Sequence, residues 1–206
     1  MKRKVISLSL IVIMIIGLFI LTGCGKKEEN HSKDYACISI GDNGSTVNYE
    51  TYMILDEDIV KYKYSESEDD SKYKDVLGYT LNVNYYFEGI KEGNTEIWVM
   101  DIYPGQINSI IKYEVSVDNN LNAKIVNSTK QYTKIKCGYI QTNNKDSQIN
   151  IEDESIAKAV CTWRAPSARE IIGLKEGKTS IIVKEIDGAE KKYTVKVDAD
   201  LNVVLE

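Results

Sequence analysis

The chain has 206 residues, of which 31 are acidic and 26 are basic, and its formal net charge at pH 7 is −5. This acidic balance, together with the absence of any nucleic-acid-binding motif, argues against DNA or RNA as a partner. The only histidine, His31, lies in a polar stretch near the N-terminus, so catalysis by a Ser-His or Cys-His pair is excluded. Because no Walker loop, dinucleotide fingerprint or zinc-protease motif occurs either, we expect a non-catalytic protein without a cofactor.

The first segment of the chain has the layout of a signal peptide. Three basic residues at positions 2–4 precede an apolar run from Val5 to Leu21, and this order predicts export. The run ends in Leu-Thr-Gly-Cys at residues 21–24, which resembles the bacterial lipobox; the resemblance implies removal of residues 1–23 and lipidation of Cys24. The alternative is a retained transmembrane anchor, because the run nearly reaches the length that a spanning helix needs. Both interpretations place the following domains on the outer face of the bacterial cell membrane.

Residues 24–34 follow as a polar, charged stretch that lacks large apolar residues. This composition predicts a flexible tether, and His31 within it cannot be held in the fixed geometry that a catalytic or metal site requires. Without the three positive charges of the leader, the formal charge falls from −5 to −8.

The rest of the chain contains the same pattern twice. Residues 88–99 read EGIKEGNTEIWV and residues 172–183 read IGLKEGKTSIIV. A second segment follows each of these blocks, at residues 112–118 and at residues 192–198, and these two segments also match each other. An earlier pair, DEDIVK at residues 56–61 and DESIAK at residues 153–158, keeps the same order. Three ordered matches predict a duplicated domain.

Both copies have the alternation and the turn residues of β-strands, with no lasting helical periodicity. We therefore expect an all-β fold of two tandem Ig-like antiparallel β-sandwiches, with domains at residues 35–127 and 128–206. The chain has 14 tyrosines and 2 phenylalanines. Tyrosine suits half-exposed strand positions, and exposed tyrosines can also serve recognition.

Two insertions distinguish the first copy. It has 13 more residues between its third strand and its Gly-rich turn, and its later hairpin is four residues longer around residues 103–106. We expect both insertions to lie in loops, where binding function is commonly found.

Cys24 apart, the chain has cysteines at positions 37, 137 and 161. An exported protein can form disulfides, so Cys137 and Cys161 are a candidate pair that would clip together two strands of the second domain; buried free thiols are the alternative. The D-x-D-x-N stretch at residues 198–202 looks like the opening of a calcium loop but lacks the Gly and the distal Glu, so we interpret it as a strand-connecting turn and expect no metal site.

The second domain, with DESIA at residues 153–157, IGLKEGKTSI at residues 172–181 and YTVKV at residues 193–197, resembles the bacterial Ig-like domains of the group-2 type, which are surface modules of adhesins and cell-wall proteins. The first domain resembles the chagasin family of cysteine-protease inhibitors. Its framework YFEGIKEG at residues 86–93 fits that family better than its loops do. The resemblance implies three partner-binding loops, the first at Thr46, the second at Gly78 and the third at Tyr103 and Pro104.

These observations predict a lipid-anchored surface protein that acts by binding a protein, a peptide or a cell-wall ligand. The chagasin-like resemblance makes inhibition of a papain-type cysteine protease an alternative, and a passive spacer in the envelope is a third. The clustering of the three loops at one end of the first domain is a further expectation.

Overall fold

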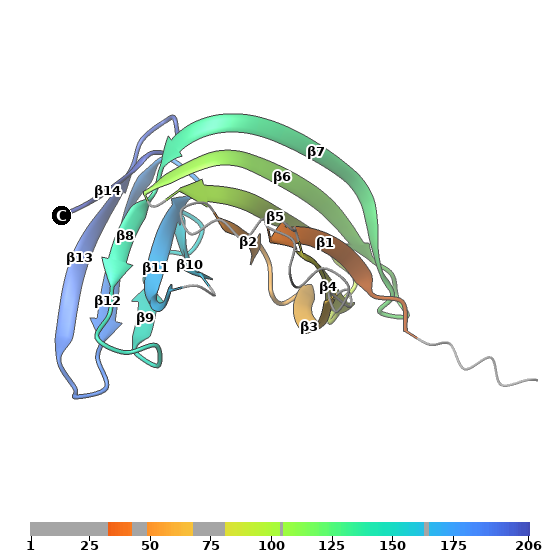
Figure 1. Cartoon of the computed structure of the whole chain (residues 1–206), viewed down its shortest axis with the longest axis horizontal. Coiled ribbons are helices and arrows are strands. Elements are labelled where there is room, and N and C mark those ends of the chain that lie inside the picture. Colours follow the sequence, from red (N-terminus) through yellow and green to blue (C-terminus); the bar gives the residue numbers. More distant parts are fainter. Residues whose placement is uncertain (1–32, 43–48, 68–80, 104, 163–164) are drawn as a thin grey trace, which may run out of the picture. The chain divides into compact units, whose positions relative to one another are not determined.

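The computed structural model describes residues 33–42, 49–67, 81–103, 105–162 and 165–206. The leader, Cys24 and His31 lie outside these ranges, while Asp34–Glu206 form one compact unit. Every regular element of the described residues is a β-strand, and all strand pairs are antiparallel (Figure 1). No helix in these ranges is long and apolar enough to cross a membrane. The expected all-β class is confirmed.

The first module is a sandwich of two sheets. Its described strands are β1 (Ala36–Asp42), β2 (Tyr49–Ile54), β3 (Val60–Ser67), β4 (Leu81–Gly89), β5 (Gly93–Tyr103), β6 (Gln106–Val117) and β7 (Ala123–Lys136). One sheet has the order β1-β4-β3 and the other has the order β2-β5-β6-β7. Their facing side chains form a core around Phe87, Ile97 and Val115, all of which are fully buried.

The second module repeats this topology strand for strand. It consists of β8 (Gly138–Gln141), β9 (Gln148–Ile151), β10 (Ala157–Thr162), β11 (Ala165–Gly173), β12 (Gly177–Lys184), β13 (Glu190–Val197) and β14 (Val203–Leu205). Its sheets are β10-β11-β8 and β14-β13-β12-β9, the same orders shifted by seven strands. Each module therefore pairs its strands as the B-E-D and C-F-G sheets of an immunoglobulin-type sandwich, with an added strand at the edge of the second sheet.

The two copies share individual hydrogen bonds as well as strand order. Before the third strand of each module, the backbone N–H of Asp56 donates to Thr95 Oγ1 at 3.1 Å, and that of Asp153 donates to Thr179 Oγ1 at 2.9 Å. The D-x-D-x-N stretch is a turn in which Asp198 Oδ1 accepts the backbone N–H groups of residues 200 and 202. Asp118 does the same in the first copy, so these carboxylates serve the backbone.

A glycine in each copy lets this Asp-rich turn approach the sheet. A Cβ added to Gly89 would lie 2.4 Å from Val117 Cγ1 and 2.7 Å from the carbonyl oxygen of Leu121. A Cβ added to Gly173 would lie 2.7 Å from Val197 Cγ1 and 2.6 Å from a carbonyl oxygen in the corresponding turn. The matching Gly-rich stretches thus reflect a close contact between chain segments that excludes any larger residue.

The connection between the modules is a strand. The expected boundary after residue 127 falls inside β7, which stays paired with β6 up to the Lys136–Gln106 pair. The backbone N–H of Lys136 donates to Asn202 Oδ1 at 2.9 Å, as that of Asp34 donates to Asn122 Oδ1 at 3.2 Å. Lys136 is therefore the counterpart of Asp34, and residues 127–135 lengthen the sheet of the first module up to the start of the second copy.

The longer hairpin of the first copy also differs from our expectation. Its four additional residues do not form a loop, because β5 and β6 have 11 and 12 residues where β12 and β13 have 8 each. The added length carries Ile102 and Ile107, which are fully buried. They belong to an apolar cluster that joins the modules and consists of Met53, Trp98, Met100, Ile102, Ile107, Ile110, Cys137, Val160 and Ile172.

This cluster explains why one part of β5 is buried on both faces. Ile97 and Val99 pack into the core of the first module, while Trp98 and Met100 face the second module. A continuous apolar run of this kind is expected only where both faces of a strand are covered. The two modules consequently share one apolar interface.

Candidate functional site

Most of the sequence-predicted binding residues fall outside the described ranges. Thr46, Gly78 and Pro104 do so, as does Cys24. Tyr103 lies at the end of β5 and is 47% exposed. Beside it, the carbonyl oxygen of Gly105 accepts the backbone N–H of Cys137 at 3.1 Å, so the tip of this hairpin is hydrogen-bonded to the start of the second module.

The three described cysteines are free thiols, and no disulfide joins Cys137 to Cys161. Cys137 is buried between the modules, where its thiol donates to Glu170 Oε2 at 3.1 Å. Burial and the neighbouring Glu170 carboxylate raise the pKa of the Cys137 thiol well above its usual range. Cys161 is exposed on β10 and Cys37 is exposed on β1. In place of the candidate disulfide, Cys137 makes a thiol–carboxylate hydrogen bond and Cys161 remains a free, exposed thiol.

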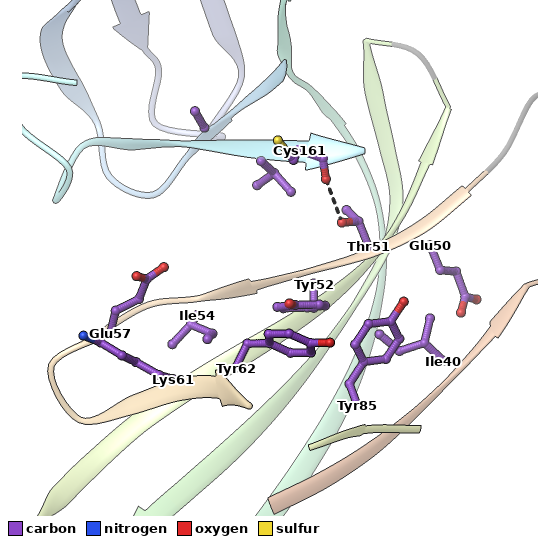
Figure 2. Close-up of a pocket in the computed structure, with 12 residues that line it drawn as sticks. Ile40, Glu50, Thr51, Tyr52, Ile54, Glu57, Lys61, Tyr62, Tyr85 and Cys161 are labelled. Carbon is purple, nitrogen blue, oxygen red and sulfur yellow. Dashed lines mark hydrogen bonds between the residues drawn. The ribbon is translucent and has the colours of Figure 1, made fainter. Parts of the chain in front are cut away.

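A groove of about 550 Å³ lies between β10 and the open edge of the first sandwich (Figure 2). Its lining comprises Ile40, Glu50, Thr51, Tyr52, Ile54, Glu57, Lys61, Tyr62, Tyr85, Ala159, Val160 and Cys161. This volume lies within the range of small-molecule sites. The groove draws its residues from both modules, so it exists only when the two are joined.

Three tyrosines form the aromatic part of the groove. The rings of Tyr52 and Tyr62 stack with centroids 6.1 Å apart and 25° between their planes, and Tyr85 lies 5.1 Å from Tyr52. Phe87 supports the group from the core, 5.2 Å from Tyr52 in an edge-on contact. Tyr62 is 43% exposed, whereas Tyr52 and Tyr85 are half-buried. The cluster therefore offers ring surface to solvent while its inner side is held by the core.

Burial makes the hydroxyl group of Tyr52 less acidic than that of an exposed tyrosine. Desolvation, aided by the neighbouring Tyr62 and Tyr85, raises the pKa of Tyr52 far above its usual value of 10.0. Tyr52 thus keeps its proton throughout the physiological range. Its hydroxyl is a neutral hydrogen-bonding group of a residue that lines the groove.

Charged side chains lie at both ends of the tyrosine row. Figure 2 shows Glu57 and Lys61 at one end and Glu50 at the other. Glu57 and Lys61 are exposed, and Glu50 is half-buried. The groove therefore combines aromatic ring surface with two carboxylates, which accept hydrogen bonds, and one ammonium group, which donates them.

The walls of the groove are fixed by contacts between the modules. Thr51 Oγ1 on β2 donates to the carbonyl oxygen of Cys161 on β10 at 3.3 Å. Lys158 Nζ donates to the carbonyl oxygen of Ile54 at 3.0 Å and lies 3.8 Å from Glu154 Oε2. These bonds connect β2 to β10 along one side of the groove.

The second copy has no equivalent of the tyrosine cluster. The strand registers match Tyr52 with Ile149, Tyr62 with Ala159 and Tyr85 with Arg169. The same sandwich therefore forms without an aromatic residue at any of these positions. Sequence reasoning noted the abundance of tyrosine but not this group, although the aligned DEDIVKY and DESIAKA stretches already contain the Tyr62–Ala159 difference.

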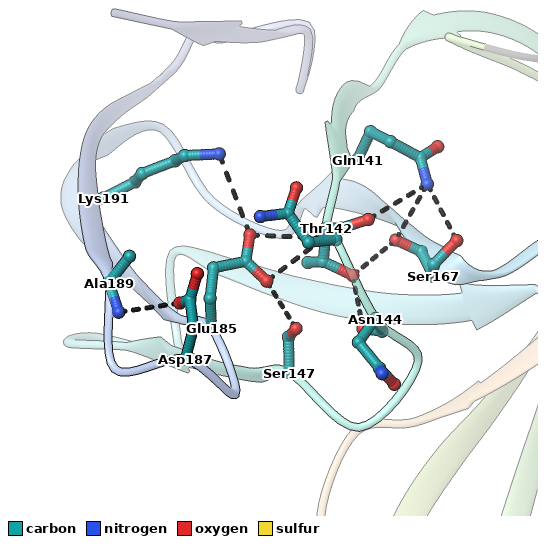
Figure 3. A network of polar contacts seen from close by, with 10 residues as sticks. Gln141, Thr142, Asn144, Ser147, Ser167, Glu185, Asp187, Ala189 and Lys191 are labelled. Carbon is teal, nitrogen blue, oxygen red and sulfur yellow. Dashed lines mark hydrogen bonds and ion pairs between the residues drawn. The ribbon is translucent and has the colours of Figure 1, made fainter.

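A polar network at the far end of the second module has a structural role (Figure 3). The buried carboxylate of Glu185 accepts from Ser147 Oγ and from the backbone N–H of Asn143, and it lies 3.8 Å from Lys191 Nζ. Thr142 Oγ1 donates to the carbonyl oxygen of Ser167 at 2.7 Å. These bonds tie together the β8–β9 connection, the β12–β13 turn and β11, with the buried carboxylate satisfied by its neighbours.

Within the described ranges, no group of three His, Cys, Asp or Glu side chains is arranged to hold a metal ion. Comparison of the chain with protein-family models, with curated proteins and with solved structures gives no match.

Proposed function

We propose that this chain is a non-catalytic binding protein, anchored through lipid on Cys24 to the outer face of a bacterial cell membrane, and that the groove between its modules receives the ligand. The observation that carries the proposal is the tyrosine cluster of the first copy. Tyr62 leaves 43% of its surface exposed, and the second copy forms the same sandwich with alanine there. A large ring that the fold does not require is typical of a recognition surface.

The protease-inhibitor alternative has less support. An inhibitor of the chagasin type uses its third loop to enter a protease cleft, and the corresponding hairpin here packs Ile102 and Ile107 against the second module. Its tip also hydrogen-bonds Cys137. Measuring papain activity at increasing concentrations of the full chain distinguishes protease inhibition from ligand binding in the groove. Inhibition at micromolar concentration or below would favour the inhibitor alternative.

The proposal is tested by sedimentation of the full chain, in detergent micelles, with isolated cell walls of the source bacterium. We expect the wild type to sediment with the walls and Tyr62→Ala to reduce binding at least tenfold. Tyr64→Ala is the matched control, because Tyr64 is 38% exposed and pairs with Tyr86 on the opposite face of the same sheet. Equal binding by all three proteins, or no binding by the wild type, would refute the groove as the site.

A further inference from the structure

We infer that the ligand of the groove is a saccharide, bound with a sugar ring against Tyr62 and Tyr85 and with its hydroxyl groups on Glu50, Glu57 and Lys61. This inference rests on the proposed function and names the chemical class of the ligand. The groove has room for such a ligand, since its volume of about 550 Å³ lies in the range of small-molecule sites.

The aromatic geometry matches the two surfaces of a sugar. A pyranose ring has an apolar face of C–H groups, which packs on an aromatic ring, and a rim of hydroxyl groups, which needs hydrogen-bond partners. Tyr62 and Tyr85 lie with their ring centroids 6.3 Å apart and their planes 54° to each other, so they form two adjoining walls. Tyr52 backs Tyr62 in a near-parallel stack, which fixes the exposed ring before the ligand arrives.

The charged groups match a hydroxyl-rich ligand of low net charge. Carboxylates accept hydrogen bonds and an ammonium donates them, so Glu50, Glu57 and Lys61 together serve hydroxyl groups in both directions. Two acids and one base leave the groove slightly negative, within a chain whose expected mature part has a formal charge of −8. A polyanionic ligand would be repelled by this arrangement.

An added peptide strand fits the groove less well. The edges of β2 and β10 face each other, but the side chains of Thr51 and Lys158 already bridge them through the carbonyl oxygens of Cys161 and Ile54. A strand inserted between two edges needs about 4.8 Å on each side, and the bridging side chains occupy that space. The third nearby edge, β3, has a bulge between Tyr62 and Tyr64, which disrupts strand pairing there.

The test uses the full chain in detergent micelles and a panel of defined, uncharged oligosaccharides of glucose, mannose and N-acetylglucosamine, each with four sugar units. Isothermal titration calorimetry measures binding, and the tightest binder is then titrated into variants. We expect at least one oligosaccharide to bind, Tyr62→Ala to weaken it at least tenfold, and Tyr62→Phe to retain binding within about threefold because the ring remains. Tyr64→Ala is expected to match the wild type. Binding should also persist in 0.5 M salt, since stacking and short hydrogen bonds are not screened like separated charges.

Three outcomes would overturn the inference. No oligosaccharide of the panel binds, or Tyr62→Ala binds as tightly as the wild type, or Tyr64→Ala weakens binding as much as Tyr62→Ala does. If cell walls bind in a manner that depends on Tyr62 but no oligosaccharide binds or competes, the groove remains the site and the saccharide assignment is wrong. If wall binding is itself independent of Tyr62, the proposed function fails as well. Near-ultraviolet circular dichroism of Tyr62→Ala confirms that a loss of binding is not a loss of fold.

Discussion

The three described cysteines differ in what surrounds their sulfur atoms. Cys137 is buried and donates to Glu170, which is 1% exposed, whereas Cys37 and Cys161 are exposed. A thiol reacts as its thiolate, and both burial and the raised pKa keep Cys137 in the thiol form. Burial and the raised pKa therefore make Cys137 unreactive, whereas the thiols of Cys37 and Cys161 are accessible to reagents.

We predict that the full chain with Cys24→Ser has two thiols that react rapidly with a disulfide reagent and a third that reacts only on unfolding. Cys137→Ala should remove the slow thiol and leave both fast ones. Only one reactive thiol, in the folded and the unfolded protein alike, would indicate that Cys137 and Cys161 form a disulfide after all.

The Asp-rich turns make the stability of the folded state depend on pH in the acid range. Hydrogen bonds from the side chain and backbone of Asn202 lower the pKa of Asp198 below its usual value of 3.8, and Asn122 does the same for Asp118. A carboxylate whose pKa is depressed by folding stabilises the folded state above its unfolded pKa. That contribution is lost as the pH falls through the lower, folded pKa.

We therefore expect the wild type to lose more stability than Asp198→Asn when the pH falls from about 5 to about 2, because the variant has no proton to bind there. Urea unfolding at a series of pH values measures this. Asp200→Asn is the control, since it removes a charge from the same turn but leaves the hydrogen bonds of Asp198 in place. Parallel pH profiles for the wild type and Asp198→Asn would contradict the role of this turn.

At the scale of the strands, the hairpin of β5 and β6 holds the modules together. Its counterpart, the hairpin of β12 and β13, ends at an exposed turn in which Ile186 is 61% exposed. Ile107 in the longer hairpin is fully buried in the apolar cluster between the modules. The same type of hairpin is thus a solvent-exposed end in one copy and part of an interface in the other.

Ile107→Ala should lower the free energy of unfolding by about 2–5 kcal/mol, because it leaves a cavity in a packed interface. Ile186→Ala should change it by less than about 0.5 kcal/mol, as expected of an exposed site. Chemical denaturation of both variants measures the difference. A loss of similar size in the two would show that the hairpin tip does not pack against the second module.

At the scale of the whole molecule, the modules are linked by the shared apolar cluster, by the continuous strand β7 and by hydrogen bonds that include those of Thr51, Lys158 and the Gly105 carbonyl. Separation would expose Val160 and Ile172 of the second module to water, at a cost of roughly 1.5–3 kcal/mol for each fully exposed side chain. The modules should accordingly stabilise each other.

We predict a single cooperative unfolding transition for the full chain, with coincident midpoints by fluorescence of the tryptophans and by far-ultraviolet circular dichroism. Ile107→Ala should lower the midpoint seen by both probes. Two separate transitions in the wild type would mean that the modules unfold independently and that the interface is weak.

The duplication and the all-β class could be predicted from the sequence because they depend on local, repeated signals. Alternating strand residues, the Gly-rich turn before β5 and β12, and the Asp-rich turns act within a few residues of one another, and the structure repeats them in both copies down to single hydrogen bonds. The run Ile-Trp-Val-Met at residues 97–100 is apolar at every position, but only the structure shows that the second module covers Trp98 and Met100.

Only the tertiary structure decided what the differences between the copies do. The length of a hairpin can be counted in the sequence, but whether its tip is a free loop or an interface depends on where the next module packs. Likewise, Tyr52, Tyr62 and Tyr85 come from three strands of two sheets, and the groove is completed by Ala159 to Cys161 more than 70 residues away in the sequence. A site assembled across a module interface leaves no local pattern, because its residues become neighbours only when the two sandwiches pack together.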